Sequence, residues 1–254
     1  MFVNPSTPLI SIKPLNFILW FTLAFQAGAI NVGGFLSCQR FVTHVTGFAT
    51  HVGVDIASGA LLEAISMAMV PVFFIFGCMT SAFFIDRRKH LGKMPYYTRI
   101  FFASGLLFLI LSISGSFGVL GPFGQTLKPS VIFSLLAVLS FLSGVQNSMI
   151  GFASGLLVRT THLTGITTDL GVGLMRMFYP RLKDEQKLTE LKLNVLRMGT
   201  ISAFIFGSIL GGAAFSRFHF AGFLLPTGIS FTLALYSWRH HQLTALKSAK
   251  TEQR

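Results

Sequence analysis

Apolar segments long enough to cross a lipid bilayer recur along the whole chain, and they restrict the fold more than any other feature. The clearest are residues 15–36, 63–85, 100–120, 130–158, 196–215 and 221–238. About 20 apolar residues span the hydrocarbon core as a helix. Only 11% of the residues are charged, whereas a soluble domain has about 25%. We therefore predict an all-α, polytopic helical membrane protein that forms a single integral membrane domain over residues 1–254.

The basic charge of the chain does not indicate nucleic-acid binding. The formal net charge is +12, but the Lys and Arg residues lie in short loops between apolar segments, where cytoplasmic loops and anionic lipid headgroups account for them. Cys38 and Cys78 lie in apolar surroundings and lack metal-ligand spacing. The sequence thus predicts the lipid bilayer as the main partner, with no nucleic acid, no metal and no cofactor. It leaves homo-oligomer formation open.

One motif occurs twice and interrupts an apolar segment each time. Residues 44–53 read HVTGFATHVG, and residues 162–171 read HLTGITTDLG. The shared frame is His-x-Thr-Gly-x-x-Thr-x-x-Gly. The segment behind the first copy is short and polar for a membrane span, since it carries His51, Asp55 and Ser58. We interpret the two copies as broken-helix elements.

Shorter matches flank the motif in the same order in both halves of the chain. GAIN at residues 28–31 matches GVQN at 144–147 ahead of the motif, and FIFG at 74–77 recurs at 204–207 behind it. Ordered matches of this kind indicate an internal duplication. Each repeat then comprises one long span, one short polar segment and two further spans. The repeats cover about residues 15–120 and 130–240.

The distribution of positive charge favours one of two topologies. If all eight segments cross, 12 of the 20 Lys and Arg residues are cytoplasmic and 8 are not. If the two short segments do not cross, 17 are cytoplasmic, and only Arg40, Lys128 and Arg217 lie outside. Because cytoplasmic loops are rich in Lys and Arg, we predict six crossing helices, two short non-crossing helices and cytoplasmic termini. The charged residues 180–197 are expected in a surface helix or loop. An eight-helix bundle with parallel repeats is the alternative.

Three crossings in each repeat make an inverted internal repeat, because the second repeat must enter the membrane in the opposite orientation. Many transporters follow this plan, with sites near the midplane at the repeat interface. Thr46 and Thr164 are favourable N-caps, and Gly47 and Gly165 permit a sharp entry into a helix. A helix that begins there presents free N–H groups and a positive dipole end, which suit a polar or anionic ligand.

Charged and amide side chains near the two helix starts complete the predicted site. Asp55 and Asp169 lie behind the motifs, where an ionisable group within a membrane segment indicates a functional role or an ion pair with Arg. Arg40 and Arg159 precede the motifs, and interface snorkelling explains them as well as ligand contact does. For the amide side chains, interhelical hydrogen bonding is the default interpretation, and a place in the site is the functional one. The predicted substrate-binding or pathway residues are Asn31, His44, Thr46, Gly47, His51, Asp55, Gln146, Asn147, Arg159, His162, Thr164, Gly165, Thr168 and Asp169.

The second motif resembles a known family. Residues 158–170, VRTTHLTGITTDL, are similar to the second-half signature of the YoaK-type bacterial membrane proteins, a domain-of-unknown-function family, and GVQN at 144–147 resembles its Gly-x-Gln-Asn stretch. The resemblance covers about residues 15–240 and implies a bacterial inner-membrane location, but no activity. The family usually has Gly-x-x-Asp ahead of the first motif, where this chain has GAIN with Asn31. A proton or cation role for that carboxylate therefore does not carry over.

We predict a small transporter or channel for a small polar or anionic solute, with a midplane site between the two His-x-Thr-Gly elements. An intramembrane enzyme is one alternative, although the sequence has no HExxH, GxSxG, Cys–His pair or phosphate loop. A structural or partner-binding membrane protein is another. The sequence identifies neither the solute nor a coupling ion.

Overall fold

The computed structural model describes residues 14–43, 46–125, 127–155, 160–179 and 183–252, and no strand occurs in these ranges. In chain order the α-helices are α1 (Pro14–Cys38), α2 (Thr46–Ala57), α3 (Leu61–Ser81), α4 (Arg87–His90), α5 (Tyr97–Ser116), α6 (Pro129–Ser154), α7 (Leu163–Arg176), α8 (Asp184–Phe218) and α9 (Leu224–Glu252). A π-helical turn, Ala82–Asp86, joins α3 to α4, and a 3-10 turn, His219–Phe223, joins α8 to α9. The described residues confirm the all-α prediction.

Five helical stretches in the described ranges are long and apolar enough to cross a membrane, judged by length and composition. They are α1, Leu61–His90, α5, α6 and Asp184–His240, and the last contains both α8 and α9 up to His240. Large apolar side chains such as Phe76, Phe102 and Phe206 are exposed along these stretches. Exposed apolar surface of this extent is unfavourable in water and suits a lipid environment. The structure therefore supports the predicted class, a multi-pass helical membrane protein.

The two halves of the chain pack against each other through their long helices. α1 packs against α8, and α6 packs against α3. Gly28 on α1 lies against the backbone of Phe204, and Gly144 on α6 lies against the backbone of Phe74. These contacts join corresponding positions of the two predicted repeats. A Cβ atom at either glycine would overlap the facing carbonyl oxygen, so the helices approach this closely only because both residues are glycine.

Glycines on the opposite sides of both interfaces make the same kind of contact. Gly207 on α8 lies against the backbone of Phe25, and Gly77 on α3 lies against the backbone of Phe141. Each interface therefore has a glycine from both helices, at matching positions in the two halves.

The residue after each of these glycines adds an interhelical hydrogen bond. Ser208 Oγ donates to the Gly28 carbonyl at 3.3 Å, and Cys78 Sγ donates to the Gly144 carbonyl at 3.4 Å. The remaining long helices, α5 and α9, pack against each other. The contacts of α1 with α8 thus correspond closely to those of α6 with α3.

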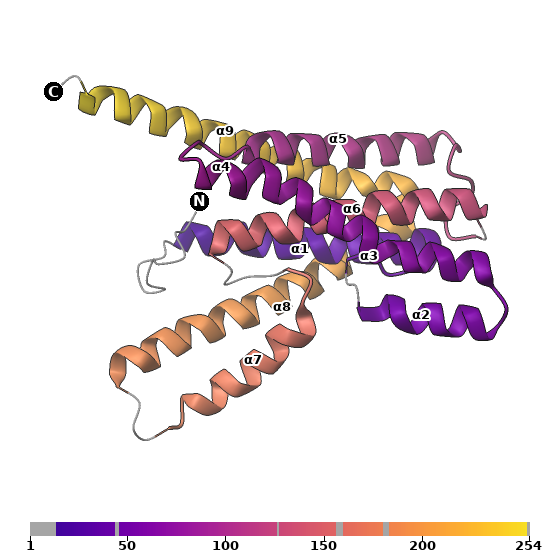
Figure 1. Ribbon diagram of the computed structural model, residues 1–254, viewed down its shortest axis with the longest axis horizontal. Helices are drawn as coiled ribbons and strands as arrows, with labels where there is room; N and C mark the ends of the chain where they lie inside the picture. Colours follow the sequence, from indigo (N-terminus) through magenta and orange to yellow (C-terminus); the bar gives the residue numbers. More distant parts are fainter. Residues whose placement is uncertain (1–13, 44–45, 126, 156–159, 180–182, 253–254) are drawn as a thin grey trace.

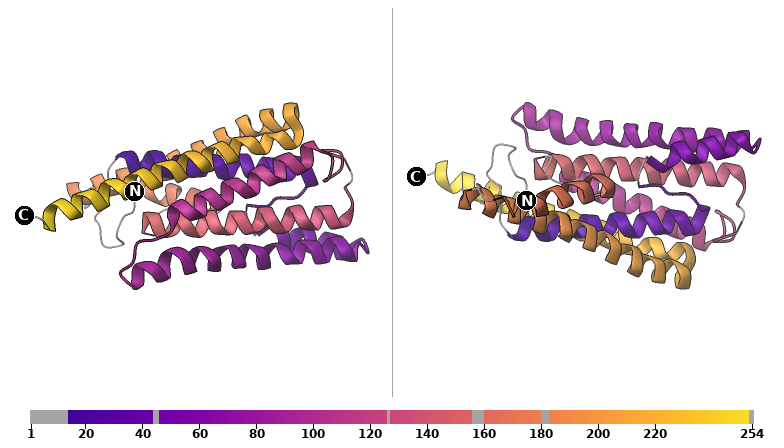
Figure 2. Two further views of the ribbon diagram at one scale, coloured as in Figure 1. Left: turned by 90° about the horizontal axis from the view of Figure 1, so that it is seen from above. Right: turned by 90° about the horizontal axis from the view of Figure 1, so that it is seen from below.

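Corresponding helices of the two halves run in opposite directions along the long axis of the molecule (Figure 1). α1 runs from left to right and α6 from right to left, and α3 and α8 are opposed in the same way. Views from above and below show the long helices side by side, with the end of α9 extending beyond them (Figure 2). The start of α1 and the end of α9 both lie at the left end.

The two short helices contain the repeated motif and differ from the long ones in where they begin. α2 packs on α3, and α7 packs on α8. Both begin near the middle of the long axis and run toward opposite ends of the molecule (Figure 1). α2 and α7 have 12 and 14 residues, about 18 and 21 Å at 1.5 Å per residue, which is shorter than a bilayer core.

The charged segment expected at 180–197 is not a separate surface element. From Asp184 onward it forms the first part of α8, a single helix of 35 residues that also contains the apolar segment predicted at 196–215. The helix continues because charged and polar side chains of this first part bond to one another and pack against α7.

Candidate functional site

In the first half, a charged contact holds α2 to the chain segment that follows α1. Arg40 Nη2 lies 3.5 Å from both carboxylate oxygens of Asp55, and Arg40 Nη1 lies 3.4 Å from His51 Nδ1. The Arg40 and Asp55 side chains are only 24% and 10% exposed. His51 and Asp55 are four residues apart and therefore share one face of α2. Two predicted site residues thus converge on Arg40.

Asn31 fixes the same chain segment to α1. Its Oδ1 accepts a hydrogen bond of 2.9 Å from Thr43 Oγ1, and Thr43 is buried. The chain reverses between these two residues at Gln39, whose φ is 54°. The Asn31 amide therefore positions the chain as it approaches α2.

The equivalent hydrogen bond is not made in the second half. Asn147 and Thr161 correspond to Asn31 and Thr43 in the repeat, yet Asn147 Oδ1 and Thr161 Oγ1 are both buried without a hydrogen-bond partner in the described part of the chain. The buried hydroxyl of Thr160 is also without one. Gln146, the neighbour of Asn147, bonds across the interface, since its Nε2 donates to the Leu23 carbonyl at 2.7 Å.

On α7 the predicted site residues are exposed. Thr164, Gly165, Thr168 and Asp169 all lie on the surface of this helix, and the Thr168 hydroxyl donates to the Thr164 carbonyl of its own helix at 2.9 Å. The prediction that Thr164 caps α7 is wrong. The helix begins at Leu163, and its N-cap is His162, which has φ −92° and ψ 52° and makes no side-chain cap bond.

The remaining predicted residues are only partly described. His44, Arg159 and the side chain of Thr46 lie outside the described part. α2 begins at Thr46, and Gly47 is half-buried in its first turn, while His162 is exposed at the start of α7.

Sequence reasoning missed a charged cluster between α7 and α8. Arg197 Nη1 donates to Glu190 Oε1 and to Asn194 Oδ1, both at 2.7 Å, and Arg176 Nη1 lies 3.7 Å from Glu190 Oε2. Gly173 of α7 lies so close to these groups that a Cβ there would overlap them. The sequence spacing could have indicated this cluster, because Asn194 and Arg197, four and seven residues after Glu190, share its face of a helix.

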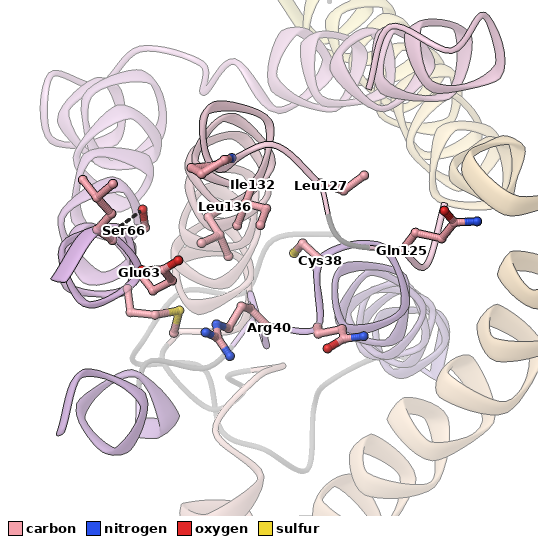
Figure 3. Close-up of a pocket in the computed structure, with 12 residues that line it drawn as sticks. Cys38, Arg40, Glu63, Ser66, Gln125, Leu127, Ile132 and Leu136 are labelled. Carbon is pink, nitrogen blue, oxygen red and sulfur yellow. Dashed lines mark hydrogen bonds between the residues drawn. The ribbon is translucent and has the colours of Figure 1, made fainter. Parts of the chain in front are cut away.

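A pocket of about 310 Å³ lies at one end of the bundle, beside the Arg40 contact (Figure 3). The end of α1, the start of α3, the connection after α5 and the start of α6 form its walls. Arg40, Glu63 and Gln125 are its main polar residues. Glu63 and Gln125 were not predicted as site residues, because an isolated polar residue beside a span is typical of any membrane interface.

Comparison with known proteins identifies a family and leaves the activity open. No curated protein and no solved structure matches the chain. The family described as "Protein of unknown function (DUF1275)" matches residues 19–236, which covers both copies of the motif and all five membrane-compatible stretches in whole or in large part. The match agrees with the resemblance to the YoaK-type proteins seen in residues 144–170. The chain therefore belongs to the DUF1275 family of proteins of unknown function.

Proposed function

We propose that the protein is a small membrane transporter or channel for a small polar or anionic solute. The observation that carries the proposal is the pair of short helices, α2 and α7, which begin near the middle of the long axis and run toward opposite ends (Figure 1). A helix that begins at the midplane of the membrane directs its free N–H groups and positive dipole end toward that midplane. Interrupted helices of this kind form the midplane sites of many transporters. The solute site would lie between the two helix starts.

An inverted repeat with six crossing helices accounts for the packing. The α1–α8 and α6–α3 interfaces use glycines at matching positions, and corresponding helices run in opposite directions. A two-fold axis perpendicular to the long axis would relate such halves. Inverted repeats allow one site to open alternately to each side of the membrane, because each half can adopt the conformation of the other.

The charges support an orientation in a bacterial inner membrane with both termini in the cytoplasm. The end of the bundle with the start of α1 and the end of α9 also carries α4, with Arg87, Arg88 and Lys89. The opposite end has far fewer cations, among them Arg40 and Lys128. The positive-inside rule assigns the cation-rich end to the cytoplasm.

The polar groups of the second half supply contacts for a solute or for water on its path. Asn147 Oδ1 and the hydroxyls of Thr160 and Thr161 are buried without partners in the described ranges. A buried polar group without a partner costs about 1–3 kcal/mol, so an occupant that bonds to these groups gains free energy. Hydroxyl donors and an amide acceptor suit a polar solute.

Solute flux into liposomes tests the proposal. The purified protein is reconstituted, and uptake is measured for a panel of small carboxylates, inorganic anions and amino acids, with protein-free liposomes as the blank. We expect uptake of at least one compound, and a fall of about tenfold for Thr161→Val, the size expected for one lost polar contact. Thr232→Val, an exposed threonine of α9 whose hydroxyl bonds to its own helix, is the matched control. The absence of flux for the whole panel would contradict the transport function.

Cysteine accessibility tests the six-crossing topology. Single cysteines are introduced at Lys93 and Lys187 in a chain with Cys38→Ser and Cys78→Ser, the latter reproducing the serine at the matching position 208. Both sites should react with a membrane-impermeant thiol reagent from the cytoplasmic face. Labelling from opposite faces would rule out the six-crossing arrangement, because the alternative with eight crossings places the two loops on different sides.

A further inference from the structure

The pocket at the end of the bundle carries opposite charges on facing walls. Arg40 comes from the segment that follows α1, and its guanidinium points across the pocket toward α3, which carries Glu63 and Ser66 (Figure 3). Gln125 adds an amide from the connection before α6. The space of about 310 Å³ is at the lower limit for small-molecule sites, so the pocket suits a compound of a few non-hydrogen atoms.

Arg40 retains the capacity to bind an incoming carboxylate. Its contacts with Asp55 and His51 are 3.5 and 3.4 Å long, whereas a strong charge-assisted hydrogen bond measures about 2.7–2.9 Å. A guanidinium group has five N–H donors and binds a carboxylate through two parallel bonds. A solute carboxylate can therefore bind the guanidinium beside Asp55 or displace that side chain.

The local charge balance disfavours a simple anion. One cation, Arg40, is accompanied by two carboxylates, Asp55 and Glu63, and no Lys, Arg or His of the described ranges forms an ion pair with Glu63. A solute with only a negative charge would bind in a pocket that the Glu63 carboxylate also lines, and like charges repel. A solute that also carries an ammonium group pairs with Glu63 instead.

We infer that this pocket binds a small zwitterion, with the carboxylate on Arg40 and the ammonium group on Glu63. The carbon skeleton contacts the apolar part of the lining, which includes Met67, Ile132 and Leu136. An amino acid of small size has this chemistry. The inference deepens the proposed function, on which it rests, by naming the class of solute and the place where it enters from the non-cytoplasmic side.

Three matched probes test the inference on the full-length protein in lipid nanodiscs. L-Alanine carries both charged groups, propionate lacks the ammonium group, and ethylamine lacks the carboxylate. Equilibrium dialysis with radiolabelled probes should show that alanine binds about tenfold more tightly than either, as expected for one additional charged hydrogen bond. Glu63→Gln should weaken alanine binding by about the same factor and leave propionate binding equal or stronger.

A second pair of variants separates the site from general effects on the fold. Arg40→Lys keeps the charge but removes the paired N–H geometry, so it should weaken both alanine and propionate while ethylamine is unaffected. Glu185→Gln, an exposed residue in the first turn of α8, should change nothing. Equal binding of alanine and propionate, an unchanged ratio in Glu63→Gln, or no binding of any probe overturns the inference.

Flux measurements distinguish this inference from the transport function itself. Alanine binding that depends on Glu63, without flux in liposomes, supports the pocket and contradicts transport. Flux of propionate that does not depend on Glu63 supports transport and contradicts the zwitterion site.

Discussion

The two short helices carry the same motif but are held in different ways. α2 is bound through Arg40, whose contacts with Asp55 are 3.5 Å long. α7 is held against α8 through the close approach of Gly173 to Glu190, Asn194 and Arg197, and through the ion pair of Arg176 with Glu190 at 3.7 Å. The first half also makes the hydrogen bond between Thr43 and Asn31, for which the second half has no equivalent. A repeated sequence thus gives equivalent long-helix interfaces but non-equivalent short helices, so the variation between the halves is concentrated at the candidate site.

The largest effects are expected at the interfaces where the halves are alike. Gly28→Ala and Gly144→Ala each place a Cβ against a backbone carbonyl oxygen that cannot move without shifting a helix. We expect each to reduce the free energy of unfolding by on the order of 3 kcal/mol, measured by thermal and denaturant unfolding in detergent. Gly228→Ala, where a Cβ meets open space, is the control and should cause no loss. A loss in only one of the two interface variants would show that the interfaces are not equivalent.

Intermediate effects are expected at the two charged pairs, one in the α8 surface on which α7 packs and one that joins α2 to Arg40. A double-mutant cycle on Arg197 and Glu190, whose side chains are 16% and 11% exposed, should give a coupling free energy of about 2 kcal/mol. The same cycle on Arg40 and Asp55 should give less than about 1 kcal/mol, because that contact is longer and its arginine is more exposed. Unfolding free energies of single and double variants provide both values. Equal couplings would show that the charged pair beneath α7 and the pair that holds α2 do not differ in strength.

The smallest effects, of opposite sign, are expected at the matched threonines. Thr43→Val removes a hydrogen bond to Asn31 and should cost about 1 kcal/mol of stability. Thr161→Val removes a buried hydroxyl without a partner, so stability should be unchanged or higher by up to about 1 kcal/mol. Thermal unfolding of the two variants under identical conditions tests this. If both substitutions destabilised the protein equally, Thr161 would have a partner that forms in solution.

Sequence reasoning predicted the features that depend on local chemistry and pattern. The apolar segments predicted the long helices, and the interhelical hydrogen bonding considered for the amide side chains is what Gln146 makes to the Leu23 carbonyl. The placement of Thr164 as an N-cap failed because the N-cap lies two residues earlier, at His162, a difference that side-chain preference alone does not resolve.

Features that depend on contact between distant segments were not predictable from the sequence. Glu190 and Arg197 lie in a charged segment typical of a solvated surface, and only the approach of Gly173 from α7 buries them. Glu63 becomes a candidate site residue only because Arg40, 23 positions earlier in the chain, lines the same pocket. The reversal at Gln39 brings Arg40 toward the start of α3. For Asp55 the sequence allowed an ion pair with an arginine or a functional role, and the structure contains the ion pair with Arg40.

α8 is one uninterrupted helix of 35 residues, so a movement at one of its ends is transmitted to the other. Its close contacts with the α1 backbone are at Phe204, Gly207 and Gly211, and Gly207 is the central one. About 35 Å of helix lies on the side of Gly207 that carries α7 and about 17 Å on the other, at 1.5 Å per residue. If Gly207 serves as a fulcrum, the arm attached to α7 is twice as long as the opposite arm. A tilt that moves the Phe218 end of α8 by one ångström then moves the Asp184 end by about two. A small rearrangement at the buried glycines therefore gives a displacement about twice as large at α7.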